Sequence, residues 1–233
     1  MNPPIEIVQP TYFANSKDIA ELPLLNAPFP DEFNHYQYLM VCKKVPIHHQ
    51  NYELFPLLQR CLLYQAGYYQ KIGMSAMAFD TYQQLVKSTI SGQEVWLAYL
   101  ELAKLGEKFA YSTQNEIAAY LLKAFDVQPL RAESLVKLAC LYRVQKKYRL
   151  AYLFAKQALD LPKPPPFSLG IEYACYDWQA RDEYAIACYW INDYKAAEIS
   201  CRQLLASEFL PEDQRPRIED NLKWALLGPA KNP

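Results

Sequence analysis

Apolar residues recur every three or four positions through most of the chain, from about residue 55 to near its end. This spacing is typical of α-helices that bury one face, because an α-helix completes a turn in about 3.6 residues. Short breaks divide the pattern into segments of helical length. Glycine is scarce, with 6 residues in 233, whereas strands joined by tight turns need glycine for positive φ angles. The pattern therefore predicts an all-α protein.

Pairs of such segments repeat along this region with a period of about 34 residues, and the clearest pair begins at Ala132. Large apolar, small and aromatic residues occupy set positions in it, on both sides of a turn at Lys146. They are Leu135, Leu138, Ala139 and Tyr142 before the turn, and Tyr148, Ala151, Ala155 and Ala158 after it. Small residues let two helices approach closely, and aromatic residues fill the space between successive pairs. The pattern predicts an antiparallel helix hairpin that Pro162 closes.

Three further pairs follow the same pattern less completely. One starts near Leu62, and the next has Trp96 at the fourth position of its first helix. In that second pair the later helix is displaced, so we expect a long loop around 106–115. The last pair follows a proline-rich break at 161–166. A final helix over about 212–227 has an apolar side, as the terminal cap of a helical-repeat array requires. That side consists of Ile218, Leu222, Ala225 and Leu226.

Residues 1–52 differ from the rest of the chain. Their first fifty positions contain seven prolines, each of which removes a backbone donor and restricts the residue before it. The stretch is nevertheless apolar, whereas a solvated linker would be more polar. We expect an irregular arm over 1–52 that packs on a repeat domain over 53–233.

The repeat units resemble the tetratricopeptide repeat, a hairpin of two antiparallel helices. The stretch from about Leu57 to Leu226 is similar in particular to the tetratricopeptide-like region that follows the catalytic domain in many bacterial family-2 glycosyltransferases. The similarity is carried by Gly92–Ala98, Arg131–Glu133, Tyr148–Ala155, Asp182–Trp190, Leu210–Glu212, Arg217, Ile218 and Asn221. The resemblance implies a right-handed α-solenoid of about four hairpins, in a module that accompanies such enzymes or stands alone.

The sequence has no recognisable catalytic constellation. The glycosyltransferase domain is missing, and so is the Asp-x-Asp motif whose carboxylates would hold a divalent ion at the diphosphate leaving group. No phosphate-binding glycine loop, nucleophile elbow or His-Glu-x-x-His motif is present. We therefore predict a protein that is not an enzyme, with no cofactor and no metal site.

Charge and cysteine content narrow the choice of partner and compartment. The net charge is −1 and the isoelectric point about 6.3, which disfavours a nucleic-acid partner. No apolar run is long enough to span a membrane, and the N-terminus does not read as a signal peptide. The six cysteines form no Cys-x-x-Cys pair, and most lie within apolar helical patterns. These features predict a cytoplasmic protein whose thiols remain reduced.

The first helix of each hairpin lines the concave surface in this type of repeat, and the sequence predicts partner-binding residues there. They are Arg60, Gln70, Lys71, Glu101, Lys104, Arg143, Asp182, Tyr189 and Trp190. The surface is mixed and partly apolar, which suits an extended or helical segment of a protein partner. Tyr189 and Trp190 are the expected anchors, because aromatic residues dominate binding hot spots.

Each of these predictions has a plainer alternative. In the plainer interpretation, Tyr189 and Trp190 pack against the terminal helix. The apolar arm is a second alternative, as an internal occupant of the concave surface. Asp182 and Glu183 are expected on a helix surface, paired with Arg181 or Arg202. The main functional hypothesis is an adaptor or assembly subunit that binds a protein or peptide. The alternatives are an accessory part of a glycosyltransferase and a structural subunit of a larger particle, with a homo-oligomer as one form of it.

Overall fold

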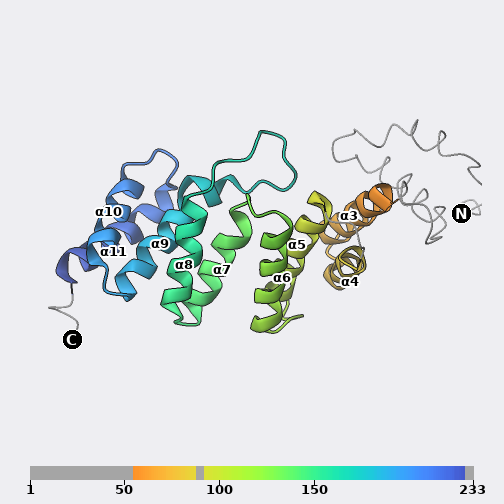
Figure 1. Cartoon of the computed structure of the whole chain (residues 1–233), viewed down its shortest axis with the longest axis horizontal. Helices are drawn as coiled ribbons and strands as arrows, with labels where there is room; N and C mark the ends of the chain where they lie inside the picture. The colour runs from red at the N-terminus through yellow and green to blue at the C-terminus, as the bar shows by residue number, and fades with distance from the viewer. Residues whose placement is uncertain (1–54, 88–91, 229–233) are drawn as a thin grey trace, which may run out of the picture. The chain divides into compact units, whose positions relative to one another are not determined.

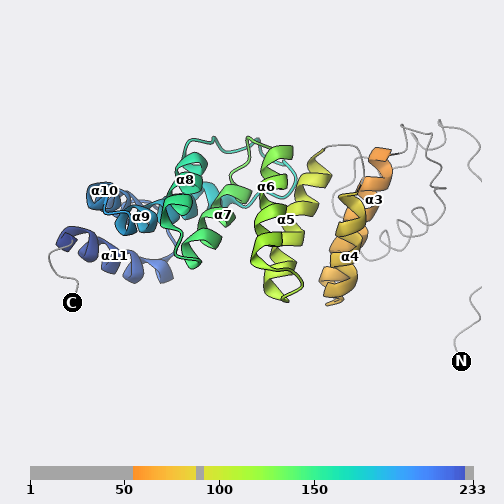
Figure 2. The ribbon, with the colours of Figure 1, turned by 60° about the horizontal axis from the view of Figure 1, so that its bottom comes forward.

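The computed structural model describes residues 55–87 and 92–228, and these residues form helices, turns and loops with no strand among them. The predicted arm at 1–52 lies outside the described residues. Two compact units divide the chain after Ile90, and each is described by itself. Figure 1 and Figure 2 label the helices.

The first unit contains one described hairpin, formed by α3 (Phe55–Lys71) and α4 (Ser75–Leu85). Ala66 and Ala78 are completely buried, as the repeat pattern predicts for its small positions. The Tyr82 hydroxyl donates a hydrogen bond to Gln70 Oε1 at 2.7 Å, which ties the two helices together.

The second unit contains three hairpins and a final helix, each packed against the next along the chain (Figure 2). The hairpins are α5 (Gln93–Lys108) with α6 (Gln114–Val127), α7 (Glu133–Val144) with α8 (Tyr148–Leu159), and α9 (Ala180–Trp190) with α10 (Tyr194–Leu205). A π-helical turn, η3 (Cys175–Gln179), leads into α9, and a 3₁₀ turn, η4 (Glu212–Gln214), leads into α11 (Arg215–Leu227). The predicted hairpins and final helix are therefore confirmed.

Small side chains lie where the helices of a pair meet. Ala139, Ala151 and Ala155 are completely buried between α7 and α8, and Cys188 and Ala197 are buried between α9 and α10. Four cysteines are buried free thiols, as predicted for small core residues: Cys61, Cys175, Cys188 and Cys201. Aromatic rings fill the wider gaps, for example Tyr142 stacked on Phe154 with 5.6 Å between ring centroids.

Three of the hairpins turn in the same way, with a left-handed residue two positions before the first residue of the second helix. This residue is Gly73, Lys146 or Asn192, with φ of 80°, 59° and 69°. In the second of these, the Lys146 amide donates to the Arg143 carbonyl and the Lys147 amide to the Tyr142 carbonyl. This pair of hydrogen bonds is the Schellman motif, which satisfies the last carbonyls of a helix.

The α5–α6 hairpin departs from the expected geometry. The extra residues mainly lengthen the first helix, because α5 continues through Gly106 to Lys108, while the loop is only 109–113. Gly106 lets this loop pack closely against α5, since a Cβ atom there would lie 2.9 Å from the Ser112 side chain. The predicted long loop is therefore largely helix.

The terminal helix also differs in one position from its predicted apolar side. Ile218 and Ala225 are buried, but Leu226 is 55% exposed. Leu226 belongs to the last turn of α11, where no further helix among the described residues covers it.

Candidate partner-binding groove

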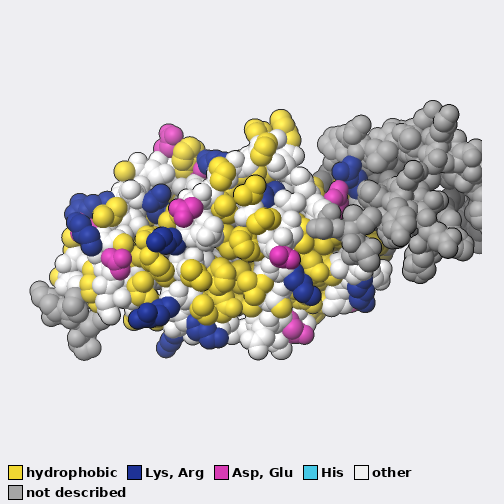
Figure 3. Space-filling model, viewed as in Figure 1, with side chains coloured by type: hydrophobic (Ala, Val, Ile, Leu, Met, Phe, Trp, Pro, Cys, Tyr) yellow, Lys and Arg dark blue, Asp and Glu magenta, His cyan; other side chains and the backbone are white. Residues whose placement is uncertain are grey.

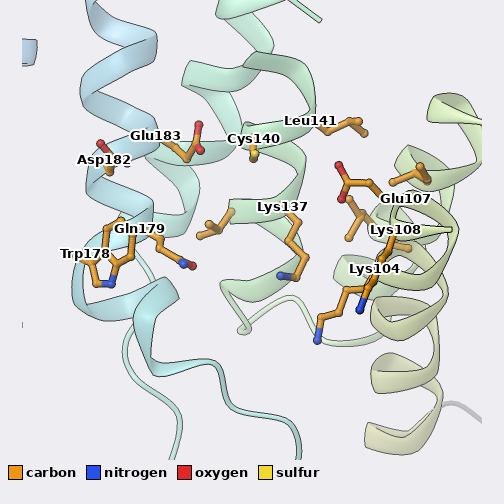
Figure 4. Close-up of a pocket in the computed structure, with 14 residues that line it drawn as sticks. Lys104, Glu107, Lys108, Lys137, Cys140, Leu141, Trp178, Gln179, Asp182 and Glu183 are labelled. Atoms are coloured by element: carbon orange, nitrogen blue, oxygen red, sulfur yellow. The ribbon is translucent and has the colours of Figure 1, made fainter. Parts of the chain in front are cut away.

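The first helices of the three hairpins in the second unit enclose a cavity of about 450 Å³. Its walls come from α5, α7, η3 and α9, and its floor includes side chains of α6 (Figure 4). The lining residues are Ala103, Lys104, Glu107, Lys108, Ile117, Leu121, Val136, Lys137, Cys140, Leu141, Trp178, Gln179, Asp182 and Glu183. We call this cavity the groove.

Apolar side chains form the floor of the groove. Ile117, Leu121 and Leu141 belong to the buried core between α5, α6 and α7, and Val136 is buried on α7. These side chains are held by core packing, so the floor is preformed. It offers an apolar surface to a side chain that enters between the polar walls.

Lysines mark the wall formed by α5 and α7. The Lys104 ammonium lies 2.5 Å from Glu101 and 2.6 Å from Glu172, and Lys137 lies 2.9 Å from the other oxygen of Glu172. Burial alone would lower the pKa of Lys104, but the attraction of the two carboxylates outweighs burial and raises it. Burial would likewise raise the pKa of Glu172, yet the two lysines lower it. Two cations thus share two carboxylates, and this wall is close to neutral.

Carboxylates mark the opposite wall, and each is buried in an ion pair with an arginine. Arg143 of α7 holds Glu183 with hydrogen bonds of 2.6 and 3.0 Å, which raise the pKa of Arg143. Arg217 of α11 holds Asp182 with hydrogen bonds of 3.1 and 2.8 Å. The expected surface pairs with Arg181 or Arg202 are therefore wrong. Asp182 and Glu183 instead join α9 to the helices before and after it.

A smaller hollow of about 260 Å³ lies between α9, α10 and α11. Trp190 and Trp224 both border it, about half exposed each, together with Tyr189, Ile186 and Asn221. The Trp190 ring also stacks on Tyr148 of α8 with 4.8 Å between centroids. The ring is thus held in place on one side and open to a partner on the other.

The predicted partner-binding residues separate into four groups. Lys104 and Asp182 line the groove, whereas Glu101 and Arg143 hold charged groups of its walls. Tyr189 and Trp190 border the hollow. Arg60, Gln70 and Lys71 lie on α3, in the first unit.

Sequence reasoning missed several residues of the groove. Lys137 precedes the groove-lining Cys140 by three positions and so lies on the same face of α7, which a wider prediction for that face would have included. Trp178 lies in the π-helical turn, which the repeat pattern does not anticipate. Glu172 belongs to the loop before η3, and no signal in the sequence assigns it to Lys104 and Lys137.

Comparison with solved structures gives the fold. The chain resembles a tetratricopeptide repeat protein from Parabacteroides merdae ATCC 43184 with a TM-score of 0.57 and 14% sequence identity, over 82% of this chain and 68% of that chain. The fold is that of tetratricopeptide-repeat proteins. Two structures of MamA align at 16% and 15% identity with TM-scores of 0.43 and 0.42, over 82% and 83% of this chain and 84% and 82% of theirs. No protein-family model and no curated protein matches the chain.

The described residues offer neither a membrane-spanning helix nor a metal site. No helix in the described ranges has the length and apolar character needed to cross a bilayer. Residues 55–87 and 92–228 also contain no cluster of three or more histidine, cysteine or acidic side chains placed to hold a metal ion.

Proposed function

We propose that this tetratricopeptide-type chain is a protein-interaction module that binds an extended segment of a partner protein in the groove. The observation that carries the proposal is the groove itself, whose apolar floor lies between polar walls supplied by three successive hairpins. Such a surface offers pockets for alternate side chains of an extended segment and polar groups for its backbone.

The charges of the walls suggest the character of the segment. Lys104 and Lys137 are paired with Glu101 and Glu172, while Glu183 and Asp182 are paired with arginines. A strongly charged ligand would have to compete with these pairs. A segment with a net charge near zero and at least one large apolar side chain fits the groove better.

Capture of the partner by tagged full-length chain tests the proposal when groove and control variants are compared. Lys137→Glu places a carboxylate against Glu172 at the groove, whereas Lys123→Glu makes the same charge change on α6, outside the groove lining. We expect the partner to be lost with Lys137→Glu and retained with Lys123→Glu. Equal capture by both variants would reject the groove as the binding surface.

Alkylation of Cys140 provides an independent measurement. Cys140 lines the groove and is partly exposed, whereas Cys175, Cys188 and Cys201 are buried. A bound segment should slow the modification of Cys140 by N-ethylmaleimide. Peptide mapping measures the rate at Cys140. An unchanged rate at saturating partner would argue against occupancy of the groove.

A second candidate is an accessory role beside a family-2 glycosyltransferase domain. The observation that favours it is that Arg131–Glu133 and Asp182–Trp190, which carry the sequence resemblance, supply the buried carboxylates of three ion pairs in this structure. The test is co-elution of the chain with a purified catalytic domain of that family in gel filtration. Separate elution at concentrations of about 10 µM would leave only interactions too weak for a stable subunit.

The cytoplasm is the compartment that this proposal assumes. The support is chemical, because the five cysteines of the described part are free thiols, and free thiols persist in reducing compartments.

A further inference from the structure

The loop between α8 and η3 carries a projecting apolar tip formed by 162–167 (Figure 1). Pro162, Lys163, Pro165, Pro166 and Phe167 are exposed. The space-filling view shows hydrophobic side chains gathered where this loop projects (Figure 3). An apolar, exposed tip gives little to the stability of the isolated chain, so it calls for another explanation.

The backbone of this tip is restricted to an extended, left-handed helix of the polyproline II type. Lys163, Pro164 and Pro165 each precede a proline, which excludes the α region for them, and prolines 164–166 have φ near −65°. The segment Pro162-Lys-Pro-Pro165 also has the Pro-x-x-Pro spacing, which places two prolines on one face of a helix with about three residues per turn.

A turn at the end of this segment presents Phe167 to solvent. The Ser168 amide donates to the Pro165 carbonyl at 3.2 Å, with Pro166 and Phe167 at the two central positions. Phe167 has φ of 71°, as the second central position of a type II turn requires, where glycine is normally found. The ring is fully exposed. A large side chain in this conformation strains the backbone and makes no compensating contact.

Contacts on both sides of the tip hold it in place. Asp177 pairs with Lys163, and the Arg131 guanidinium donates to the Leu169 carbonyl at 3.0 Å. Gly170, with φ of 63°, packs so closely on α5 that a Cβ atom would lie 2.7 Å from Leu97 Cδ1. The tip is therefore a rigid feature, which reduces the entropy lost when a partner binds.

From these observations we propose that residues 162–167 are a ligand for a protein domain of the polyproline-recognition type. Such a domain has an aromatic-lined groove for the prolines, and a neighbouring apolar pocket on it takes Phe167. Lys163 is about half exposed beside the prolines and stays paired with Asp177, so the tip carries little net charge. This surface is separate from the groove, so the inference does not depend on the proposed function.

The test uses the full-length chain and a panel of purified SH3, WW and EVH1 domains, with binding measured by isothermal titration calorimetry. Phe167→Gly removes the anchor and supplies the residue that the turn prefers. We expect it to raise the melting temperature while weakening binding at least about tenfold. Pro164→Ala with Pro165→Ala should also weaken binding, because the segment loses its preformed conformation. Leu153→Ala removes an exposed apolar side chain of α8 and should leave binding unchanged.

Three results would overturn the inference. The first is the absence of binding to every domain in the panel. The second is a lower melting temperature of Phe167→Gly, which would show that Phe167 serves the fold. The third is Phe167-dependent sedimentation with phosphatidylglycerol vesicles in the absence of domain binding, since the tip would then recognise a bilayer.

Discussion

At the scale of single residues, Glu133 shows how strongly this repeat protein relies on buried charge. Its carboxylate is completely buried and accepts hydrogen bonds from Arg131 at 3.1 and 2.6 Å and from the Tyr176 hydroxyl at 2.8 Å. The Arg131 guanidinium carbon lies over the Trp96 ring, 4.0 Å from the ring centroid. These contacts join α5, α7 and η3 at one point.

Glu133→Gln should destabilise the protein by about 3 kcal/mol, because it leaves the buried Arg131 without its counter-charge. Urea unfolding followed by circular dichroism measures the change. Asp220→Asn is the control, since Asp220 and its partner Lys223 are both mostly exposed and the urea midpoint should stay the same. A Glu133→Gln midpoint equal to that of the wild type would mean that the pair is solvated.

The buried thiols should make the folded protein less stable at alkaline pH. Burial raises the pKa of Cys188 and Cys201 to about 11 and that of Cys175 to about 12. In the unfolded chain the pKa of a thiol is about 8.5. A pKa that is higher in the folded state contributes stability that is complete below the unfolded value and is lost as the pH rises toward the folded value.

The free energy of unfolding should therefore fall between about pH 8.5 and about pH 11, by at most about 1.4 kcal/mol per pH unit for each thiol. Cys201→Ala removes one of these groups and should make the decline shallower. Urea titrations of both proteins across this range measure the two slopes, and their values near neutral pH correct for the lost side-chain packing. Parallel profiles would show that Cys201 does not contribute.

At the scale of helices and turns, the left-handed residues of the hairpins are the clearest targets for substitution. Lys146 is exposed and has φ of 59°, in a Schellman turn where glycine is preferred. Lys146→Gly should stabilise the protein by about 1 kcal/mol, because glycine adopts this conformation without strain. Asn192→Gly should change stability less, because asparagine tolerates left-handed backbone. Thermal unfolding compares the two, and destabilisation by Lys146→Gly would contradict the strain argument.

The N-terminal cap of α6 should lose stability on substitution, in contrast to the turn at Lys146. Thr113 accepts a hydrogen bond from the Glu116 amide, and Glu116 accepts one from the Thr113 amide at 2.7 Å. The hydrogen bond from the Thr113 amide and a second one from the Thr113 hydroxyl to the Glu116 carboxylate lower the pKa of Glu116. Thr113→Ala should cost about 1 kcal/mol at neutral pH. The cost should shrink as the pH falls through the lowered pKa of Glu116, because the capping box then loses its charge. A cost that is independent of pH would assign the effect to the Thr113 hydroxyl alone.

The helices of this protein could be predicted from the sequence because small residues recur where two helices touch, as at Ala139 and Ala151. That pattern is local, and it also indicated which helices face the groove. The partners of charged residues could not be predicted in this way. Arg143 and Glu183 are forty positions apart, and helical periodicity gives the face of each helix but not which side chain of the next repeat lies opposite. The path of the loop at 160–174 could not be predicted either. It depends on contacts of Arg131 and Gly170 rather than on the repeat pattern.

At the scale of the whole molecule, the question is whether the second unit folds by itself. Four core clusters of this unit are formed, within the described residues, by side chains between Trp96 and Ala225. In a helical-repeat protein, stability is approximately a sum over repeats and over contacts between neighbours, so a set of adjacent repeats can be stable alone. A fragment of residues 91–233 should therefore remain helical and unfold cooperatively in urea.

A shorter fragment without the α5–α6 hairpin should be less stable. Residues 128–233 lack α5 and α6, so Leu138 and Leu141 lose the cluster around Trp96, and Arg131 loses the ring on which it lies. This fragment should unfold at a lower urea concentration than residues 91–233, because each hairpin is stabilised by its neighbours. Circular dichroism of both fragments measures the difference. If the two fragments had the same midpoint, the α5–α6 hairpin would add no stability to the rest of the unit, and the buried Arg131–Trp96 contact would not couple them.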